Sequence, residues 1–336
     1  MKKLLLIFTV FASFCFGQNK ENQYKITGML ANFANNTWLY LSDISDGSYK
    51  DIDSTILQNE KFYFAGNLTD KVVKFGIHTK NFEDRVTFWI DDSETTIFAE
   101  KGNFKKALIK GSKEQQKQYE LDSISENTKN KKQDYIEFIQ KNPSSIVSAD
   151  LLKIYGDAWG KETASDLYQK LSPDMKNSIY GKQVLDFLTF NVSPKIGDKF
   201  VDFQQENMNG ENIKLSDYQG KIILLDFWGS WCAPCIAEFP NLINTYHSFK
   251  DQGFEILGIV ADTDKKKLTK VIEKHGLIWQ NLCDFKGDQN KVALIYGVSY
   301  YPANFLIDEH GIIIAKDLHG EDLDKKLREL LSKAHR

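Results

Sequence analysis

The feature that most limits how this chain can fold is a mostly apolar run with two cysteines a few residues after it. Residues 221–228 are typical of a buried central strand. Residues 236–250 carry apolar side chains at the three- and four-residue spacing of an amphipathic helix. Cys232 and Cys235, separated by Ala233 and Pro234, therefore lie where the predicted strand ends and the predicted helix begins. Two thiols at this spacing can close as a disulfide and reopen by exchange with another dithiol.

The two thiols have different predicted roles. At a helix N-terminus, the unpaired amide donors and the helix dipole favour the thiolate form of Cys232, so we expect this residue to be the attacking group. Cys235 follows one turn inside the helix. We expect it to be less exposed and to act as the resolving thiol.

The sequence pattern changes twice along the 336 residues. Residues 18–111 contain short β-rich runs between polar turns, which predict a small antiparallel sandwich or barrel. Residues 112–192 indicate a helical connector, in which Ser172 before Pro173 predicts a helix running towards Phe190. Residues 193–336 alternate strands and helices, among them a strand at 254–260, a helix at 265–275 and a final antiparallel pair at 304–308 and 312–316. This alternation predicts an α/β fold with helices on both faces of a central sheet.

The first 17 residues form a separate segment. Lys2 and Lys3 precede an apolar run, and Gly17 ends the segment, which is the pattern of a secretory signal peptide. A membrane anchor is the alternative, although the run is shorter than the roughly 20 residues that span a bilayer; lipid attachment at Cys15 is a third. The formal net charge is −3, and cleavage would remove two lysines and leave −5. We therefore expect a periplasmic protein and no nucleic-acid partner.

The cysteine count favours a catalytic pair over a structural disulfide framework. Cleavage would remove Cys15 and leave three cysteines, too few to staple an exported chain of this size. A zinc site would need a second cysteine pair or suitably spaced histidines, and neither is present. Ile236 after Cys235 excludes the haem-attachment motif. Cys283, on a predicted strand, is interpreted as a buried packing residue rather than a second redox centre.

Several linked motifs in residues 194–336 match a known family. They are Asp226-Phe227-Trp228, Trp231-Cys232-Ala233-Pro234-Cys235, Glu238-Phe239-Pro240, Tyr301-Pro302 and Phe305-Leu306-Ile307-Asp308. Together they resemble the TlpA/ResA-like branch of the thioredoxin superfamily, and so imply a thioredoxin-like fold for residues 193–336. The β-rich segment resembles the domain of unknown function that often precedes such modules in exported proteins.

The resemblance implies roles for the residues around the cysteines. Asp226 matches the buried acid of thioredoxins, so burial should raise its pKa and let it exchange a proton with Cys235. Glu238 matches a second acid that could share this role or tune Cys232. Pro302 would follow a cis peptide bond and face the cysteine pair. The expected substrate-contacting residues are Trp231, Ala233, Pro234, Tyr301 and Pro302.

Each of these roles has a structural alternative. Asp226 could be a satisfied structural acid, Trp228 could be a packing residue rather than part of a substrate platform, and Pro302 could be an ordinary trans proline.

We therefore expect an exported thiol-disulfide oxidoreductase that reduces protein disulfides, in cytochrome c maturation or envelope redox homeostasis. It would need no cofactor and no metal. Its partners would be protein dithiols and disulfides and an upstream membrane or periplasmic electron donor. One rival is a peroxiredoxin-like peroxidase, whose Pro-x-x-x-Thr-x-x-Cys setting is absent. The other is a ligand- or envelope-binding protein with a vestigial redox module.

Overall fold

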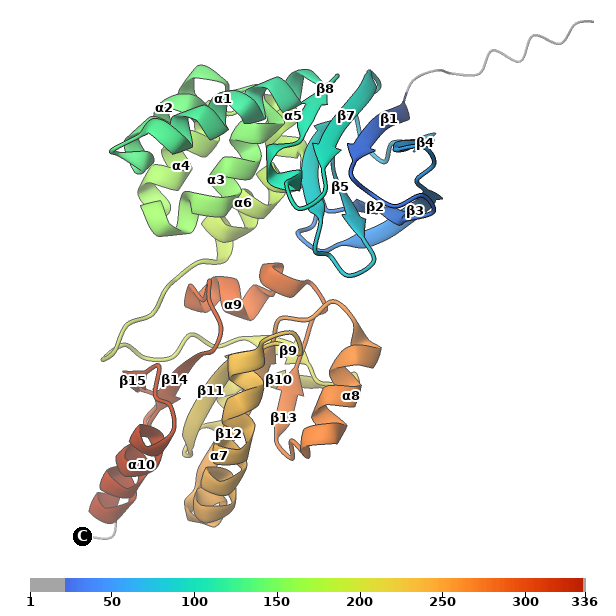
Figure 1. The fold of residues 1–336 in the computed structure, drawn as a ribbon. Helices are drawn as coiled ribbons and strands as arrows, with labels where there is room; N and C mark the ends of the chain where they lie inside the picture. Colours follow the sequence, from blue (N-terminus) through green and yellow to red (C-terminus); the bar gives the residue numbers. More distant parts are fainter. Residues whose placement is uncertain (1–21, 335–336) are drawn as a thin grey trace, which may run out of the picture. The chain divides into compact units, whose positions relative to one another are not determined.

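The computed structural model describes residues 22–334, which form two compact units divided at Lys131. Each unit is described by itself (Figure 1). The predicted signal segment, residues 1–17, lies outside the described residues. None of the helices within the described range is long and apolar enough to cross a bilayer.

The first unit contains eight strands in two four-stranded sheets. One sheet has the order β4-β1-β7-β8 and the other β3-β2-β5-β6. The strands are β1 (Gln23–Ala31), β2 (Trp38–Asp43), β3 (Lys50–Ile56), β4 (Lys61–Asn67), β5 (Val73–Thr79), β6 (Arg85–Ile90), β7 (Glu94–Glu100) and β8 (Leu108–Lys110). Alternate residues of both sheets, such as Ile26, Phe64 and Phe75, bury into a single core. The unit is therefore a small β-sandwich, as the sequence predicts.

One strand pair departs from the predicted antiparallel arrangement. β1 and β7 run parallel, with Ile26 opposite Thr95, whereas the other pairs in this unit are antiparallel. Alternating side chains show which face of a strand is buried but carry no information on the direction of its neighbour. A pairing between strands more than 60 residues apart is therefore not readable from the local pattern.

A helix follows the sandwich and is fastened to it. α1 (Lys113–Asn127) begins at Ser112, whose hydroxyl accepts the Glu114 N–H. The Oε1 atom of Gln115 accepts the backbone N–H of Trp89 at 3.0 Å, and Oε1 of Gln118 accepts its indole N–H at 3.0 Å. α1 therefore packs with the β domain, and the helical stretch 112–192 is shared between the two units.

The second unit begins with five helices, and one of their boundaries differs from the sequence prediction. They are α2 (Lys131–Lys141), α3 (Ile146–Trp159), α4 (Lys161–Lys170), α5 (Pro173–Asn177) and α6 (Ile179–Phe190). The helix predicted to run from Pro173 towards Phe190 is interrupted at Ser178. The Ser178 hydroxyl accepts the Gly181 N–H and donates to the Met175 carbonyl, so this residue ends α5 and begins α6.

The rest of the second unit is the predicted α/β module. Its sheet has the order β13-β12-β11-β14-β15, in which β11, β12 and β13 are parallel and β14 and β15 complete it with antiparallel pairings. The strands are β11 (Ile222–Trp228), β12 (Phe254–Val260), β13 (Gln280–Leu282), β14 (Ala303–Ile307) and β15 (Ile313–Lys316), preceded by the hairpin of β9 (Gln204–Glu206) and β10 (Asn212–Lys214). The helices are α7 (Ala233–Phe249), α8 (Lys265–His275), α9 (Lys291–Tyr296) and α10 (Glu321–Ala334). The predicted strand at 254–260 and helix at 265–275 are confirmed with their boundaries.

The central strand β11 divides its side chains between two cores. Ile222, Leu224 and Trp228 pack with apolar residues of α7, α8 and α10. The intervening residues, such as Leu225 and Phe227, pack on the opposite face with α9. Since both faces are covered, β11 is buried along its whole length. Its carboxyl end leads directly to the cysteines.

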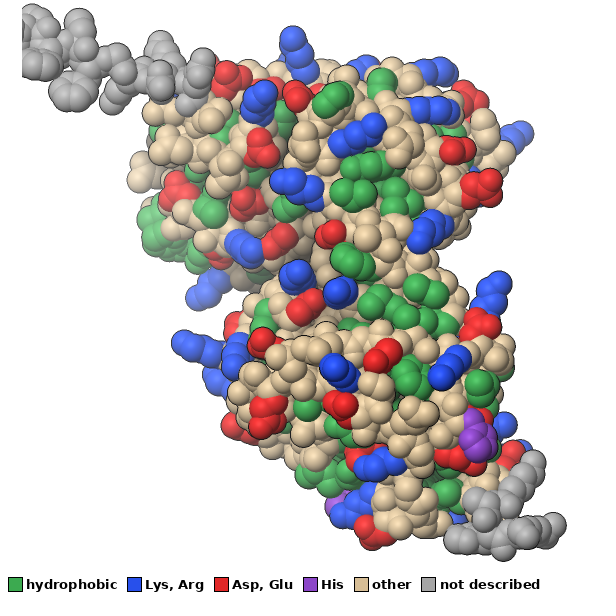
Figure 2. All heavy atoms as spheres, turned by 180° about the vertical axis from the view of Figure 1, so that it is seen from behind, with side chains coloured by type: hydrophobic (Ala, Val, Ile, Leu, Met, Phe, Trp, Pro, Cys, Tyr) green, Lys and Arg blue, Asp and Glu red, His purple; other side chains and the backbone are tan. Residues whose placement is uncertain are grey.

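Charged side chains of both signs occur together on one face of the surface. On the face that Figure 2 shows, lysine and arginine side chains are interspersed with aspartate and glutamate, and apolar side chains occur in smaller groups between them. This face therefore carries no extended field of one sign that would attract a polyanion.

Candidate functional site

The two cysteines lie at the junction that the sequence predicts. β11 ends at Trp228, and α7 begins at Ala233 with Cys232 as its N-cap residue. Cys232 and Cys235 are joined as a disulfide, and the Cys235 N–H also donates to the Cys232 sulfur at 3.2 Å. The exposed fractions of the two residues are 3% and 2%. The difference in exposure expected between them is therefore absent from this oxidised form.

A buried acid fixes the loop in front of the cysteines. The Ser230 backbone N–H and hydroxyl donate to the two carboxylate oxygens of Asp262, each at 2.7 Å. The Trp231 indole N–H donates to the Ala261 carbonyl at 2.8 Å. Sequence reasoning did not identify Ser230 and Asp262. The available signal was that Asp262 follows the end of β12, which lies beside the end of β11, because functional groups gather at the carboxyl ends of neighbouring parallel strands.

Asp226 is buried on the same face of β11 as the cysteine cluster. It lies opposite Gly258 of β12 and Asn304 of β14. Side chains alternate along a strand, so Asp226 shares its face with Leu224 and Trp228, which pack with the two cysteines. Burial, together with the negative charge of Glu238, raises the pKa of Asp226 from 3.8 to about 7. This direction agrees with the sequence prediction.

The structure also brings the second predicted acid close to the first. Glu238 is half-buried on α7, and its charge reaches Asp226 strongly enough to contribute to the raised pKa. One Glu238 carboxylate oxygen accepts the Gly320 N–H at 3.3 Å. Asn304, opposite Asp226, both donates to and accepts from the backbone of Leu318. The loop before α10 therefore helps to position both Glu238 and Asn304.

The remaining predicted site residues occupy different environments. The Tyr301-Pro302 peptide bond is cis. The Tyr301 ring lies edge-on to the Trp231 ring, with centroids 5.4 Å apart, and Trp231 is 52% exposed. Ala233 and Pro234 are exposed at the start of α7. Trp228 is buried and donates its indole N–H to Asn281, so it is a packing residue, and Trp231 is the exposed member of the two tryptophans.

Cys283 is a buried thiol, as predicted. Its exposed fraction is 3%, and burial raises its pKa to about 11. The sulfur accepts the Phe285 N–H, and the thiol points to the Asp262 carbonyl. A thiol with a raised pKa forms little thiolate at neutral pH and reacts slowly. Within residues 22–334, the structure contains no group of three or more His, Cys, Asp or Glu side chains placed to hold a metal ion.

Comparisons with known proteins agree with this geometry. The AhpC/TSA family matches residues 196–316, and a domain of unknown function (DUF4369) matches residues 24–118. The thiol-disulfide oxidoreductase ResA of Geobacillus kaustophilus is 34% identical over 148 residues, which cover 43% of this chain and 83% of that protein. The chain belongs to the ResA-like family of thiol-disulfide oxidoreductases.

Two further proteins are similar to parts of this chain. ResA of Bacillus subtilis is 36% identical over 118 residues, covering 35% of this chain and 64% of that protein. The thioredoxin domain of a thiol-disulfide oxidoreductase from Bacteroides vulgatus is 32% identical, with 41% of this chain and 99% of that domain covered and a TM-score of 0.39. The match to ResA of Geobacillus kaustophilus confirms the resemblance to the TlpA/ResA-like branch.

The site combines a cysteine at a helix N-terminus with a buried acid that titrates near neutral pH. Cys232 occupies the N-terminus of α7, where free backbone N–H groups favour a thiolate. Asp226, with a pKa of about 7, is present in both protonation states near neutral pH. It can therefore accept a proton and return it.

Proposed function

We propose that this ResA-like protein is exported and reduces disulfides of other proteins in the periplasm. The observation that carries the proposal is the Cys232–Cys235 pair at a helix N-terminus, on the same side of the sheet as Asp226, whose pKa is raised to about 7. The signal-like pattern of residues 1–17 supports export. Cytochrome c maturation and envelope redox homeostasis are the processes in which such a reductase would act.

Reduction proceeds by two exchanges that move two electrons to the substrate. The Cys232 thiolate attacks one sulfur of the substrate disulfide; a Cys232–substrate bond forms as the substrate S–S bond breaks, and one substrate thiolate leaves and takes a proton. Cys235 then attacks the Cys232 sulfur. The mixed disulfide breaks, the second substrate thiol is released, and the enzyme is left with the Cys232–Cys235 disulfide seen in the structure.

The second exchange needs a proton acceptor, because the thiolate and not the thiol attacks. Asp226 is our candidate for this role, and Glu238 tunes it, since the Glu238 charge raises the Asp226 pKa. The enzyme then returns to its dithiol form by accepting two electrons from an upstream membrane or periplasmic dithiol donor.

Insulin reduction by the purified protein, with dithiothreitol as the electron source, tests the function. Cys232→Ser and Cys235→Ser should each lower the catalysed rate by about 10³-fold or more, since a serine hydroxyl cannot take part in disulfide exchange. Cys283→Ser is the matched control and should keep the wild-type rate. Full activity of the Cys232→Ser protein would contradict the mechanism.

Two further measurements test the remaining parts of the proposal. Peroxide consumption without a dithiol partner would favour the peroxidase alternative instead. Export predicts that the protein recovered from the periplasmic fraction begins at Gln18, and N-terminal sequencing measures this. A protein that starts at Met1 and stays in the cytoplasm would contradict export.

A further inference from the structure

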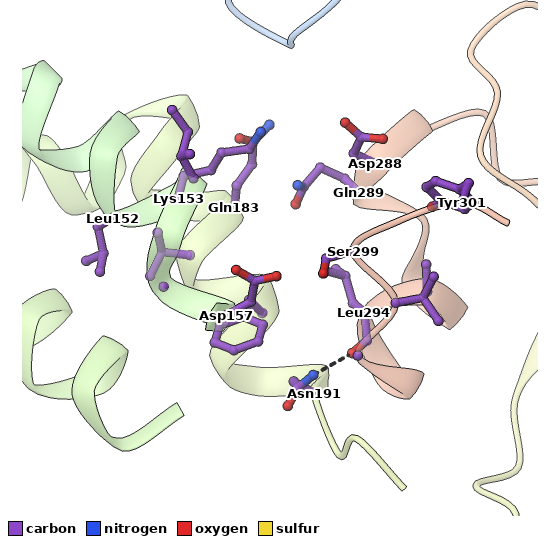
Figure 3. A pocket seen from close by; sticks show the side chains of 17 residues that line it. Leu152, Lys153, Asp157, Gln183, Asn191, Asp288, Gln289, Leu294, Ser299 and Tyr301 are labelled. Atoms are coloured by element: carbon purple, nitrogen blue, oxygen red, sulfur yellow. Dashed lines mark hydrogen bonds between the residues drawn. The ribbon is translucent and has the colours of Figure 1, made fainter. Parts of the chain in front are cut away.

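A cavity within the second unit lies between the helical segment and the thioredoxin-like module. Its volume is about 220 Å³. One wall comes from α3 and α6, and the other from the short 3₁₀ helix η4 (Gly287–Gln289), α9 and the loop after it (Figure 3). The two walls are joined by hydrogen bonds. Backbone N–H groups of Val192 and Ser193 donate to the Ile295 carbonyl, and the Asn191 side chain donates to the Leu294 carbonyl.

Tyr301 links the cavity to the redox site. Tyr301 lines the cavity, and its ring also contacts the ring of Trp231, directly before Cys232. Burial raises the pKa of Tyr301 above its usual range, and the charge of Asp288, which also lines the cavity, adds to this rise. A polypeptide bound at Trp231 and Tyr301 therefore has the cavity next to it.

The walls combine apolar surface with unused hydrogen-bond acceptors. The apolar lining is Leu152, Val184, Phe187, Ala293, Leu294 and Val298. Gln183 and Gln289 lie on opposite walls (Figure 3), and the Oε1 atom of each is buried without a hydrogen-bond partner among the described residues. A buried acceptor left unpaired is costly, so these two oxygens favour a ligand that supplies N–H donors.

The charged groups around the cavity favour a cation. Asp157 and Asp288 are exposed and line the cavity from opposite walls, so their carboxylates lie at its opening. Neither carboxylate forms an ion pair with another side chain in the part of the chain that the structure describes. Lys153 is the opposing positive charge. The lining is therefore net negative.

We propose that this cavity binds an arginine or lysine side chain of the substrate polypeptide, a few residues from the disulfide that Cys232 attacks. The inference rests on the proposed reduction of protein disulfides and names a class of substrate for it. Such a side chain has an aliphatic stem for the apolar walls and a charged head with several N–H donors for the two glutamines and the carboxylates. Arginine fits better than lysine, because its planar guanidinium carries five donors and reaches several acceptors at once.

Matched disulfide peptides test the proposal on the full-length protein. A cyclic peptide closed by one disulfide carries arginine at one of the four positions on either side of a cysteine. Its partner carries citrulline, which has the same shape but no charge. The measured quantity is the ratio of kcat/KM between the two peptides. We expect arginine to be preferred roughly tenfold at one position or more, since charged donors bind buried acceptors more strongly than neutral donors do.

Substitutions in the two walls then test whether the cavity causes the preference for arginine. Asp157→Asn and Asp288→Asn should each lower the arginine-to-citrulline ratio roughly threefold, whereas Lys153→Gln should raise it about twofold, because their charges are opposite. The double variant Gln183→Leu/Gln289→Leu should reduce the ratio about tenfold by removing both buried acceptors. Asp186→Asn is the matched control, since Asp186 is exposed on α6 and does not line the cavity. Thermal unfolding of each variant shows that it is folded.

The outcomes separate this inference from the proposed function. If the wild-type enzyme reduces neither peptide, the reductase function itself fails. If it reduces both peptides at equal rates at every position, or if its arginine preference survives the changes at Asp157, Asp288 and the two glutamines, the cavity is not the binding site and the inference is overturned.

Discussion

One buried titratable side chain in each unit, His78 in the first and Asp226 in the second, illustrates two different environments. In the β-sandwich, His78 is 2% exposed, and its ring nitrogens lie 2.9 Å from the Thr79 carbonyl and 2.9 Å from an Asp51 carboxylate oxygen. In the thioredoxin-like module, Asp226 is 5% exposed, and burial and a neighbouring negative charge both oppose its ionisation. A buried group with well-placed partners stabilises a fold, whereas a buried group whose charge is opposed can exchange protons. The difference assigns the chemistry to the second unit.

Among the substitutions that test the difference between His78 and Asp226, Asp226→Asn is expected to have the largest effect on stability. The pKa of Asp226 is about 7 in the folded protein and near 3.8 when unfolded, so the protonated acid is the form that favours folding. The wild-type free energy of unfolding should therefore fall as the pH rises from about 4 to about 7, by on the order of 3–4 kcal/mol. Asparagine does not titrate, so the unfolding free energy of the Asp226→Asn protein should not show this fall.

Urea unfolding of the wild type and the variant at pH 4.5 and pH 8 measures the effect. The variant should gain stability relative to the wild type at the higher pH. Glu238→Gln is the companion variant, which should weaken the pH dependence because it removes one cause of the raised Asp226 pKa. Wild-type and Asp226→Asn stabilities that change in parallel with pH would show that Asp226 is an ordinary acid.

In the β-sandwich, we expect His78→Ala to destabilise without affecting redox chemistry. The substitution removes a ring stacked on Phe82 at 3.8 Å and leaves Ser42 and Asp51 without their histidine partner. The unfolding free energy of the sandwich should fall by about 2–3 kcal/mol. Insulin reduction at 20 °C, where the variant is still folded, should keep the wild-type rate.

His310→Ala provides the control for this substitution. The His310 side chain is 79% exposed, so its loss should change stability by less than about 0.5 kcal/mol. A folded His78→Ala protein with a severely reduced insulin-reduction rate would break the separation between the two units.

The smallest effect concerns two tryptophans of similar exposure. Trp231 is 52% exposed beside Cys232, and Trp38 is 49% exposed on β2 of the sandwich. Trp231→Ala should raise the KM for insulin about fivefold, which corresponds to about 1 kcal/mol of lost aromatic contact. Trp38→Ala should leave KM unchanged. Equal effects of the two substitutions would remove the distinction between a substrate-facing and an ordinary surface tryptophan.

Features that depend on residues close together in the chain could be predicted from the sequence. In the module, the apolar strand at 254–260 and the amphipathic helix at 265–275 have strong local periodicity, and the strand-to-helix position of Cys232 and Cys235 follows from residues that are adjacent in the chain. Asp226 and Glu238 were identified by resemblance. Local pattern therefore located these elements, and the linked motifs proposed Asp226 and Glu238 without pointing to Ser230 or Asp262.

Features that depend on distant contacts could not be predicted in this way. The parallel pairing of β1 with β7 joins strands that are more than 60 residues apart in the sequence. The contact of Ser230 with Asp262 spans 32 residues and depends on the two parallel strands lying side by side. The break at Ser178 is a capping interaction whose residue type is compatible with either a continuous helix or a new one.

The most direct test of the account is to trap its covalent intermediate. In the Cys235→Ala protein the mixed disulfide cannot be resolved, so a disulfide-containing protein substrate should remain attached to the enzyme. Peptide mapping by mass spectrometry of the trapped complex should find the substrate on Cys232, and Cys232→Ala/Cys235→Ala should trap none. Attachment at Cys283, or trapping that persists without Cys232, would contradict the central claim that Cys232 is the attacking thiol.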